Sequence, residues 1–262
     1  MNLVIGSTSQ LAQYFPKDYI KISSRNIDFE YLKSNKWDSV YITFAEQRIY
    51  EQGIDYIGPN YIDTLKIINH LLDNSKKIVC YTSCELWNKL SCKISLDTEP
   101  SFPLTNEYTI SKLLLLNKIK ELRKLHVIYN KIMFIHPFYF NSVHRSEYFL
   151  FGKVFGSIIN KKKIKVGNLD FDRDMVHAQF VVDKSIEQNQ DCLVGSGKLF
   201  NVRKFIQDIY MLNDLDFYEF VDEDTSKVSA NDKRITADVS WDYTYNNLLR
   251  DTQADILNMK AV

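Results

Sequence analysis

The sequence lacks the charge imbalance and the long apolar runs that mark nucleic-acid-binding and membrane proteins. Its 33 lysines and arginines equal its 33 aspartates and glutamates, so no overall field attracts nucleic acid or an anionic surface. One basic run, residues 160–165, is interpreted as a solvated helix end. No apolar stretch reaches the roughly 18 residues that a membrane-spanning helix needs. We therefore expect neither nucleic acid nor a membrane among the partners.

Cysteine is also scarce, and its spacing excludes two further classes. The four cysteines, Cys80, Cys84, Cys92 and Cys192, contain no C-x-x-C pair, which argues against a zinc site and a disulfide scaffold. We expect reduced thiols and no metal. The chain opens on a strand-like apolar run rather than a signal peptide, which favours a cytoplasmic protein. There is no internal repeat, low-complexity tract or clean linker.

The first half of the chain alternates apolar runs with helical patterns. The apolar, strand-like runs lie at residues 2–6, 19–28, 37–45, 76–83 and 126–136. The helical patterns lie at residues 10–17, 29–36, 61–75 and 109–125. This alternation is typical of a parallel sheet with crossover helices. It predicts an α/β fold with a doubly wound, Rossmann-type parallel sheet.

The pattern loosens after Pro137, which predicts a smaller and less regular C-terminal portion. Helical patterns recur at residues 149–160, 178–188 and 201–212, and a strand pattern at residues 163–168. We therefore expect residues 1–137 to form the Rossmann portion and residues 138–262 a second portion. We expect residues 171–190 to return to the first portion.

Tyr108 and Lys112 carry the clearest chemical signal. They stand four residues apart at the beginning of a helical segment, so their side chains share one face of the helix. A lysine ammonium beside a tyrosine favours the phenolate and lowers the tyrosine pKa toward the range of a general acid and base. The strand that ends in YTSCELW brings Ser83 and Glu85 to the carboxyl edge of the sheet, where α/β proteins bind ligands.

These motifs together resemble the extended short-chain dehydrogenase/reductases of the NAD-dependent epimerase/dehydratase family, which act on nucleotide-activated sugars. The matching segments are residues 2–15, 26–28 (NID), 38–45 (DSVYITFA), 60–71 (NYIDTLKIINHL), 81–87, 108–112 (YTISK) and 172–183 (DRDMVHAQFVVD). The last segment is similar to the family's R-D-x-x-H-x-x-D, with Gln179 in place of the usual acid. The resemblance covers roughly residues 1–185, and the dTDP-4-dehydrorhamnose reductase and GDP-fucose synthase branches are nearest.

The resemblance implies a catalytic set and a nicotinamide cofactor. By position, Ser83, Tyr108 and Lys112 become the catalytic serine, tyrosine and lysine, and Lys112 also holds the nicotinamide ribose. Hydride transfer would then be coupled to proton transfer through Tyr108. The cofactor-binding residues expected on this basis are Gly6, Ser7, Ser9, Gln10, Leu11, Ser24, Arg25, Asp28, Phe44, Ala45, Thr82, Tyr108 and Lys112.

The expected cofactor loop is poor in glycine. The family pattern G-x-x-G-x-x-G reads here as Gly6, Ser9 and Ala12. The second glycine normally lets the backbone approach the pyrophosphate. Ser9 would fit with a negative φ, and its hydroxyl could donate to a phosphate oxygen. The following helix would offer free N–H groups and the positive end of its dipole.

The segment after the second strand bears on the choice of cofactor. The family places an acid there when it uses NAD, but here the segment reads ISSRN and has no acid before Asp28. Ser23, Ser24 and Arg25 offer hydroxyls and a guanidinium suited to a 2′-phosphate. We therefore expect NADP(H), with NAD(H) as the alternative. Asp28 matches the family position at the adenine amino group, and Phe44 and Ala45 would line the cofactor.

Several reactions and substrate contacts are compatible with this reading. Reduction of a keto-sugar is favoured, and a dehydratase, a 4-epimerase and a non-catalytic binding subunit are the alternatives. Glu85 stands where dehydratases place an acid/base carboxylate, and His144 lies near a histidine acid of GDP-fucose synthase or is an ordinary surface histidine. The expected substrate-binding residues are Ser83, Cys84, Glu85, Lys153 and Arg173, with Arg173 on the diphosphate.

The helical segments 61–75 and 109–125 predict an oligomer. Both have apolar residues around much of their circumference, including four consecutive leucines, residues 113–116. One face would pack on the sheet and the other would need a partner. In the family the corresponding helices form a four-helix dimer interface, so the resemblance implies a homodimer.

Overall fold

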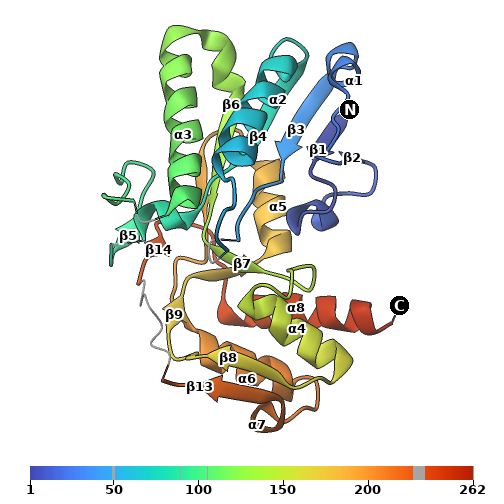
Figure 1. Cartoon of the computed structure of the whole chain (residues 1–262), viewed down its shortest axis with the longest axis vertical. Coiled ribbons are helices and arrows are strands. Elements are labelled where there is room, and N and C mark those ends of the chain that lie inside the picture. Colours follow the sequence, from blue (N-terminus) through green and yellow to red (C-terminus); the bar gives the residue numbers. More distant parts are fainter. Residues whose placement is uncertain (49–50, 89, 105, 227–233, 262) are drawn as a thin grey trace. The chain divides into compact units, whose positions relative to one another are not determined.

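The central sheet of the chain has six strands in the order β11-β6-β4-β3-β1-β2 (Figure 1). The computed structural model describes residues 1–48, 51–88, 90–104, 106–226 and 234–261. The sheet strands are β1 (Asn2–Ile5), β2 (Ile20–Ile22), β3 (Trp37–Ile42), β4 (Ser75–Tyr81), β6 (Ile132–Pro137) and β11 (Cys192–Val194). Within this sheet β2 pairs with β1, β1 with β3, β3 with β4 and β4 with β6, all in parallel. The predicted α/β class with a parallel, Rossmann-type sheet is confirmed.

Burial on both faces explains why these strands read as continuous apolar runs. One row across the sheet consists of Ile20, Leu3, Val40, Ile78 and Ile132, each paired with the next. Four of these five side chains, all but Ile20, have no exposed surface. Parallel sheets covered on both sides have this composition.

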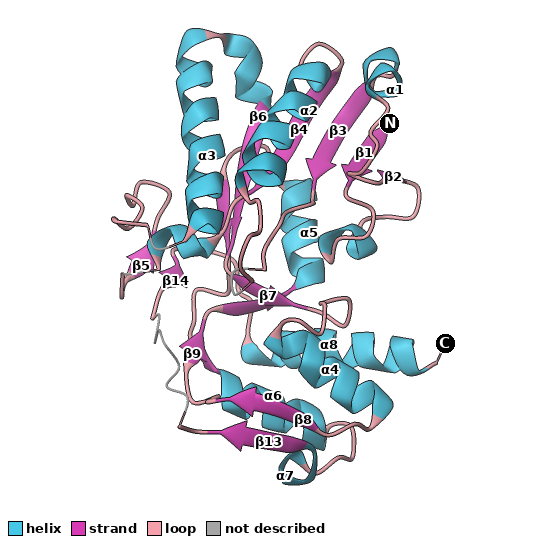
Figure 2. Ribbon diagram, in the orientation of Figure 1, coloured by secondary structure: helices cyan, strands magenta, loops and turns pink. Residues whose placement is uncertain are grey.

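The helical elements of the same region connect these strands (Figure 2). They are η1 (Leu11–Tyr14), α1 (Phe29–Ser34), η2 (Gly58–Asp63), α2 (Thr64–Leu71), η3 (Cys84–Trp87), α3 (Glu107–Leu125), η4 (Val127–Lys131) and α5 (Ala178–Glu187). Helices α2 and α3 cover one face of the sheet (Figure 1). The C-terminal end of α5 is attached to β4, because the ammonium of Lys77 donates to the carbonyls of Ser185 at 3.0 Å and Ile186 at 3.2 Å.

Two local predictions in this region are wrong. The helix expected over residues 10–17 is only the single 3-10 turn η1, because Phe15 is extended (φ −68°, ψ 147°). A proline disfavours helical backbone at the residue before it, and Pro16 follows Phe15. The strand expected over residues 126–136 begins instead with the 3-10 helix η4, and only β6 joins the sheet.

The chain divides into two units, and each is interrupted in sequence. The first consists of residues 1–86, 99–137 and 182–192, and the second of residues 87–98, 138–181 and 193–262. The segment 87–98, expected in the Rossmann portion, therefore belongs to the second unit. Its strand β5 (Lys93–Ile94) pairs in parallel with β14 (Thr236–Ala237), which is why this loop leaves the first unit. Of the expected returning segment 171–190, residues 182–190 lie in the first unit.

The second unit is built from short strand pairs and helices. Its further strands are β7 (Tyr139–Asn141), β8 (Ile164–Gly167), β9 (Asp172–Arg173), β10 (Met175–His177), β12 (Phe200–Asn201) and β13 (Val221–Asp224). Its further helices are α4 (Leu150–Asn160), α6 (Val202–Met211), α7 (Phe217–Phe220) and α8 (Tyr245–Lys260). Strand β10 pairs in parallel with β7, and β9 pairs antiparallel with β12. This agrees with the less regular pattern of the sequence after Pro137.

Candidate active site

The loop after β1 begins at a position where any residue other than glycine would be strained. Gly6 has a φ of +107°, and a Cβ there would lie 2.8 Å from the backbone nitrogen of Phe44 and 3.0 Å from Oγ1 of Thr43. The N–H groups of Gly6 and Ser7 both donate to the carbonyl of Ile22, at 2.9 and 3.0 Å. The start of the loop is therefore held between the ends of β2 and β3.

Ser9 turns its side chain toward the end of β3. Its hydroxyl donates to Oγ1 of Thr43 at 2.7 Å and accepts the N–H of Ala12 at 3.2 Å. Its own N–H donates to the carbonyl of Gly6 at 2.8 Å. Gln10 then leads into η1, where the side chain of Leu11 is buried. Since η1 has only four residues, the expected helix dipole is reduced to a single turn.

The residues after β2 lie in an exposed turn. The N–H of Arg25 donates to the hydroxyl of Ser23 at 3.0 Å, and Asn26 has a φ of +57°. Arg25 forms no ion pair with any residue that the structure describes. Asp28 caps α1, because its Oδ1 accepts the N–H of Tyr31 at 3.0 Å. The carboxylate for which the sequence predicts an adenine contact therefore has a local structural function as the cap of α1.

Tyr108 and Lys112 lie in the first turns of α3, and their positions follow from its capping. Oδ1 of Asn106 accepts both the N–H and the hydroxyl of Thr109, each at 2.8 Å, so the helix begins immediately before Tyr108. Tyr108 is 7% exposed and Lys112 is 5% exposed. The ammonium of Lys112 lies 5.9 Å from the centre of the Tyr108 ring, as the predicted spacing requires.

The strand β4 supplies the partner that holds Lys112. The ammonium donates to the carbonyl of Tyr81, the last residue of β4, at 3.0 Å. Burial lowers the pKa of Lys112 from 10.5 to about 8, because a charged ammonium loses hydration there. The lysine therefore joins the helix that carries Tyr108 to the strand end that precedes Ser83.

Ser83, Cys84 and Glu85 follow β4 as predicted. The hydroxyl of Ser83 accepts the N–H of Glu85 at 3.2 Å at the beginning of η3. Ser83 and Glu85 are partly exposed, whereas Cys84 is 3% exposed. Cys84 is thus a buried side chain, and the two polar groups on either side of it are accessible.

His136 and Asn60 are two polar residues beside this site that sequence reasoning missed. Thr82 bonds through its hydroxyl to Nδ1 of His136 at 2.6 Å, and burial lowers the pKa of His136 to about 4. The amide of Asn60 donates to the hydroxyl of Ser111 at 3.1 Å, which in turn donates to the carbonyl of Tyr108 at 2.7 Å. His136 could have been noticed as a polar residue at the end of an apolar strand.

The remaining predicted residues lie in the second unit. The guanidinium of Arg173 lies between two rings, with its Cζ 5.0 Å from the centre of Tyr139 and 4.5 Å from that of Phe171. It is 9% exposed and donates to the carbonyl of Asp172 at 2.7 Å. His144 follows β7, and Lys153 lies on α4, both with exposed side chains.

Asn141, also missed by sequence reasoning, is the unusual residue of the second unit. It ends β7 opposite His177 of β10 and is 1% exposed. Both polar atoms of its amide are buried without a hydrogen-bond partner among the residues that the structure describes. Buried amides normally have partners, so this one suits a bound polar ligand. In contrast, His177 bonds to Asp255 of α8 at 2.9 Å.

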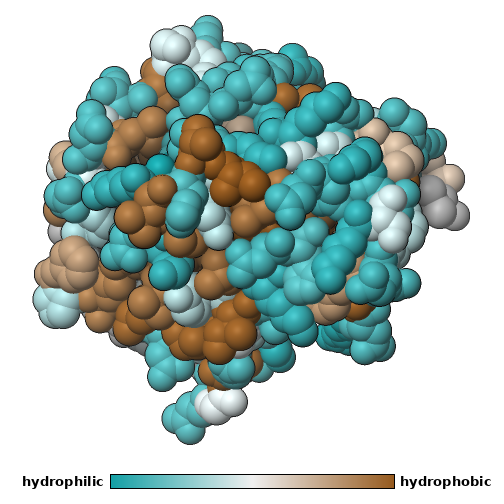
Figure 3. All heavy atoms as spheres, turned by 90° about the horizontal axis from the view of Figure 1, so that it is seen from above, coloured by the Kyte–Doolittle hydropathy of each residue, from teal (hydrophilic) through white to brown (hydrophobic). Residues whose placement is uncertain are grey.

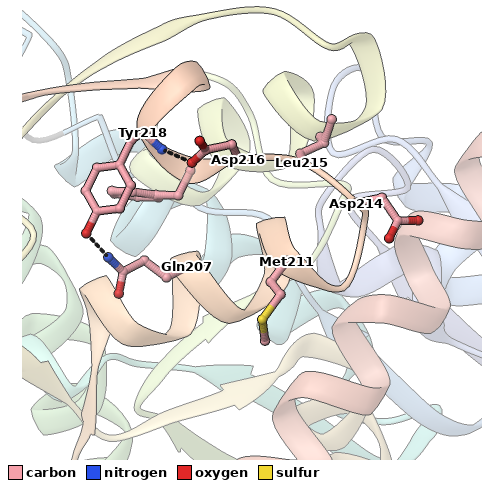
Figure 4. A pocket seen from close by; sticks show the side chains of 7 residues that line it. Gln207, Met211, Asp214, Leu215, Asp216 and Tyr218 are labelled. Carbon is pink, nitrogen blue, oxygen red and sulfur yellow. Dashed lines mark hydrogen bonds between the residues drawn. The ribbon is translucent and has the colours of Figure 1, made fainter.

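One surface hollow of about 470 Å³ lies elsewhere in the second unit. It is lined by Gln207, Met211, Asp214, Leu215, Asp216, Phe217 and Tyr218, from α6, α7 and the turn between them (Figure 4). Gln207 donates to the hydroxyl of Tyr218 at 3.3 Å across it. None of the residues predicted for the site contributes to this hollow.

The described part of the chain has neither a metal-binding cluster nor a membrane-spanning helix. Its histidines, cysteines and carboxylates form no group of three that could hold a metal ion. None of its helices has both the length and the apolar character that crossing a membrane requires.

The comparisons with known proteins identify the fold. No protein-family model and no curated protein matches the sequence. RMD from Pseudomonas aeruginosa, solved with NADPH, is similar at 14% identity and a TM-score of 0.72 over 98% of this chain and 99% of its own. UDP-N-acetylglucosamine 4-epimerase from Methanobrevibacter ruminantium, solved with UDP-N-acetylmuramic acid, is similar at 14% identity and a TM-score of 0.77 over 98% of both chains. dTDP-glucose 4,6-dehydratase from Bacillus anthracis, solved with NAD, is similar at 13% identity and a TM-score of 0.75 over 100% of this chain and 98% of its own. The chain has the fold of these proteins, which is the fold that the sequence resemblance implies.

Proposed function

We propose that this chain is an NAD(P)(H)-dependent oxidoreductase of the epimerase/dehydratase type that reduces a keto group of a nucleotide-activated sugar. The observation that carries the proposal is the pair formed by Tyr108 and Lys112. A phenol and an ammonium, both buried, lie one helical turn apart beside the carboxyl end of β4. Proteins with this fold include one solved with NADPH and others solved with NAD or a nucleotide sugar.

Tyr108 is the group that moves the proton. Its hydroxyl gives a proton to the sugar oxygen when the carbonyl is reduced and takes one in the reverse direction. The positive charge of Lys112 favours the phenolate and so lowers the energy of this transfer. Ser83, which is partly exposed at the end of β4, donates a hydrogen bond to the same sugar oxygen.

The residues present fit a nicotinamide dinucleotide. The loop has glycine at the one point where a Cβ would meet backbone, and Ser9 turns its side chain inward. The bound cofactor would supply or accept the hydride. The residues that would hold it are Gly6, Ser7, Ser9, Gln10 and Leu11 at the pyrophosphate, Ser24, Arg25 and Asp28 at the adenosine, and Phe44, Ala45, Thr82, Tyr108 and Lys112 along the rest.

We propose NADP(H) over NAD(H). Arg25 is exposed after β2, and its backbone N–H is fixed by Ser23. A guanidinium in this position suits a 2′-phosphate, which it can bind with two parallel hydrogen bonds. Replacing Arg25 with alanine should weaken NADPH binding about tenfold and leave NADH binding unchanged.

Dehydration of the sugar is the second candidate reaction. The carboxyl of Glu85 is partly exposed two residues after Ser83, where it could take a proton from the sugar. A Glu85→Gln variant separates the two reactions, because it should abolish dehydration and retain reduction.

The second unit offers groups suited to the nucleotide diphosphate. Arg173 presents a guanidinium that is fixed between two rings, and Asn141 presents a buried amide without a partner among the described residues. We propose that both bind the substrate. Lys153 is a weaker candidate because its side chain is exposed.

We also propose a homodimer through α3 and the segment before α2. Three of the four consecutive leucines of α3 are buried in the chain's own core, whereas Leu114 is 41% exposed. Ile62 and Ile110 are 56% and 38% exposed. Hydrophobic groups also gather in one half of the surface seen in Figure 3. A Leu114→Glu variant should be monomeric by light scattering if the proposal is correct.

The primary experiment is titration with NADPH and NADH, followed by tryptophan fluorescence. Saturable binding of either one supports the proposed function, and binding of neither at high protein concentration overturns it. Nucleotide sugars are then screened for thermal stabilisation of the protein with cofactor, since a ligand of the folded state raises its melting temperature. Oxidation of NADPH with a selected keto-sugar would complete the test.

A further inference from the structure

The cofactor loop contains a pair of hydroxyl groups that joins it to the sheet. Ser9 donates to Oγ1 of Thr43 at 2.7 Å, although the two residues are 34 positions apart. Thr43 donates in turn to the carbonyl of Ile5 at 3.1 Å, and its N–H reaches the same oxygen at 2.9 Å. Thr43 is 8% exposed, so this bond lies at the buried end of β3.

The bond determines where the side chain at position 9 points. With its hydrogen donated to Thr43, the hydroxyl of Ser9 has only acceptor capacity left, and it accepts the N–H of Ala12 at 3.2 Å. A hydroxyl used in this way cannot also donate to a phosphate oxygen. This argues against the hydroxyl of Ser9 as a donor to the phosphate, which was one expectation from the sequence, and leaves only the backbone of Ser9 for the pyrophosphate.

We propose that Thr43 is a positioning residue for the cofactor loop, and that it makes a serine acceptable where a glycine is expected. This inference rests on the proposed function, because it concerns the dinucleotide pyrophosphate. A serine side chain turned outward would occupy the space through which the phosphate reaches the loop backbone. Thr43 keeps it turned inward and leaves that backbone accessible.

The close approach of Gly6 to Thr43 restricts the hydroxyl of Thr43. Gly6 passes so close to Thr43 that a Cβ on Gly6 would lie 3.0 Å from Oγ1 of Thr43. The hydroxyl of Thr43 is therefore confined between Gly6, Ile5 and Ser9. A confined acceptor holds its donor in one rotamer, and this preorganisation favours ligand binding.

The test compares the wild-type protein with Thr43→Val, Ser9→Gly and the double variant. The dissociation constant of NADPH is measured by tryptophan fluorescence, and the melting temperature of the cofactor-free protein is measured in parallel. Thr43→Val should weaken NADPH binding about tenfold, which corresponds to the loss of one good hydrogen bond. Ser9→Gly should have a dissociation constant for NADPH within about threefold of the wild-type value, because glycine has no side chain to hold.

The double variant is the decisive measurement. If Thr43 acts only on the side chain of Ser9, removing that side chain should restore binding to within about threefold of the wild type. Thr64→Val is the matched control, since Thr64, the first residue of α2, is also buried and its hydroxyl donates to the carbonyl of Pro59 in η2 at 2.9 Å. It should lower the melting temperature without changing NADPH affinity.

The outcomes distinguish this inference from the proposed function. If the wild type binds neither NADPH nor NADH, the proposed function fails. If the wild type binds and Thr43→Val binds equally well, the inference fails and the function stands. Loss of affinity in Ser9→Gly would also overturn the inference, because the side chain of Ser9 would then itself contribute to binding. An unrestored double variant would mean that Thr43 has a general structural role.

Discussion

The start of α3 and the loop after β1 are held in place in opposite ways. Tyr108 and Lys112 are positioned by a cap between Asn106 and Thr109, which are three positions apart, and by the regular turn of the helix. Ser9 is positioned by Thr43, which lies 34 residues further along the chain. Gly6 is likewise held by Ile22.

The difference shows which parts of a site can be predicted from residues that are neighbours in the sequence. A helix with a clear cap places side chains four residues apart on one face regardless of the rest of the protein. An irregular loop takes its geometry from the residues that contact it. Four variants test this comparison.

Tyr108→Phe should have the largest effect, on catalysis alone. Loss of the proton-transferring hydroxyl should reduce turnover about 10²- to 10⁴-fold. Cofactor affinity should stay within about twofold of the wild type, because the ring remains. Tyr210→Phe removes another buried hydroxyl, bonded to Ser157 at 2.6 Å, and serves as the control. Full turnover in Tyr108→Phe would exclude this tyrosine as the acid and base.

Gly6→Ala should cost about 3 kcal/mol or more of the free energy of unfolding. The alanine would have both an unfavourable φ and a Cβ 2.8 Å from backbone. Gly53→Ala is the matched control, because Gly53 has a φ of +73° but no atom within 4 Å of the added Cβ. It should cost only about 1 kcal/mol. Equal effects in urea unfolding would contradict the steric argument.

Lys112 should make the stability of the cofactor-free protein depend on pH. Its pKa is 10.5 when unfolded and about 8 when folded, so between these values the unfolded chain binds more protons. The free energy of unfolding of the wild type, relative to Lys112→Met, should therefore rise by about 2 kcal/mol from pH 8 to pH 10.5. The exposed Lys120→Met variant should parallel the wild type. If the difference in the free energy of unfolding between the wild type and Lys112→Met does not change with pH, burial does not shift the pKa of Lys112.

Asn106→Ala should have the smallest effect, about 1 kcal/mol of stability. It removes the acceptor for both groups of Thr109 at the beginning of α3. Asn117→Ala, at an exposed position on the same helix, should change the free energy of unfolding by less than about 0.5 kcal/mol. Thermal unfolding measures both. If the two variants unfold alike, the cap does not define the start of this helix.

Much of the fold could be predicted from the sequence because parallel strands have a strong composition. β1 and the C-terminal halves of β3 and β4 are buried apolar runs. Gly6 follows β1, and the threonines Thr43 and Thr82 follow β3 and β4 at the carboxyl edge. Prediction from the local sequence failed at residues 10–17, where the apolar spacing is helical but Pro16 limits the element to one turn. It also failed at residues 87–98, whose partner strand β14 lies far away in the sequence.

The sequence by itself determined the succession of strands and site residues along the chain, the Tyr108–Lys112 pair and the glycine at position 6. These depend on burial periodicity, helix geometry and one steric requirement, all of which act over a few residues. Only the tertiary structure decided the rotamer of Ser9, the neutral His136 beside Thr82 and the buried amide of Asn141. Those features arise where strand ends meet, and the sheet brings together residues whose separation in sequence carries no signal.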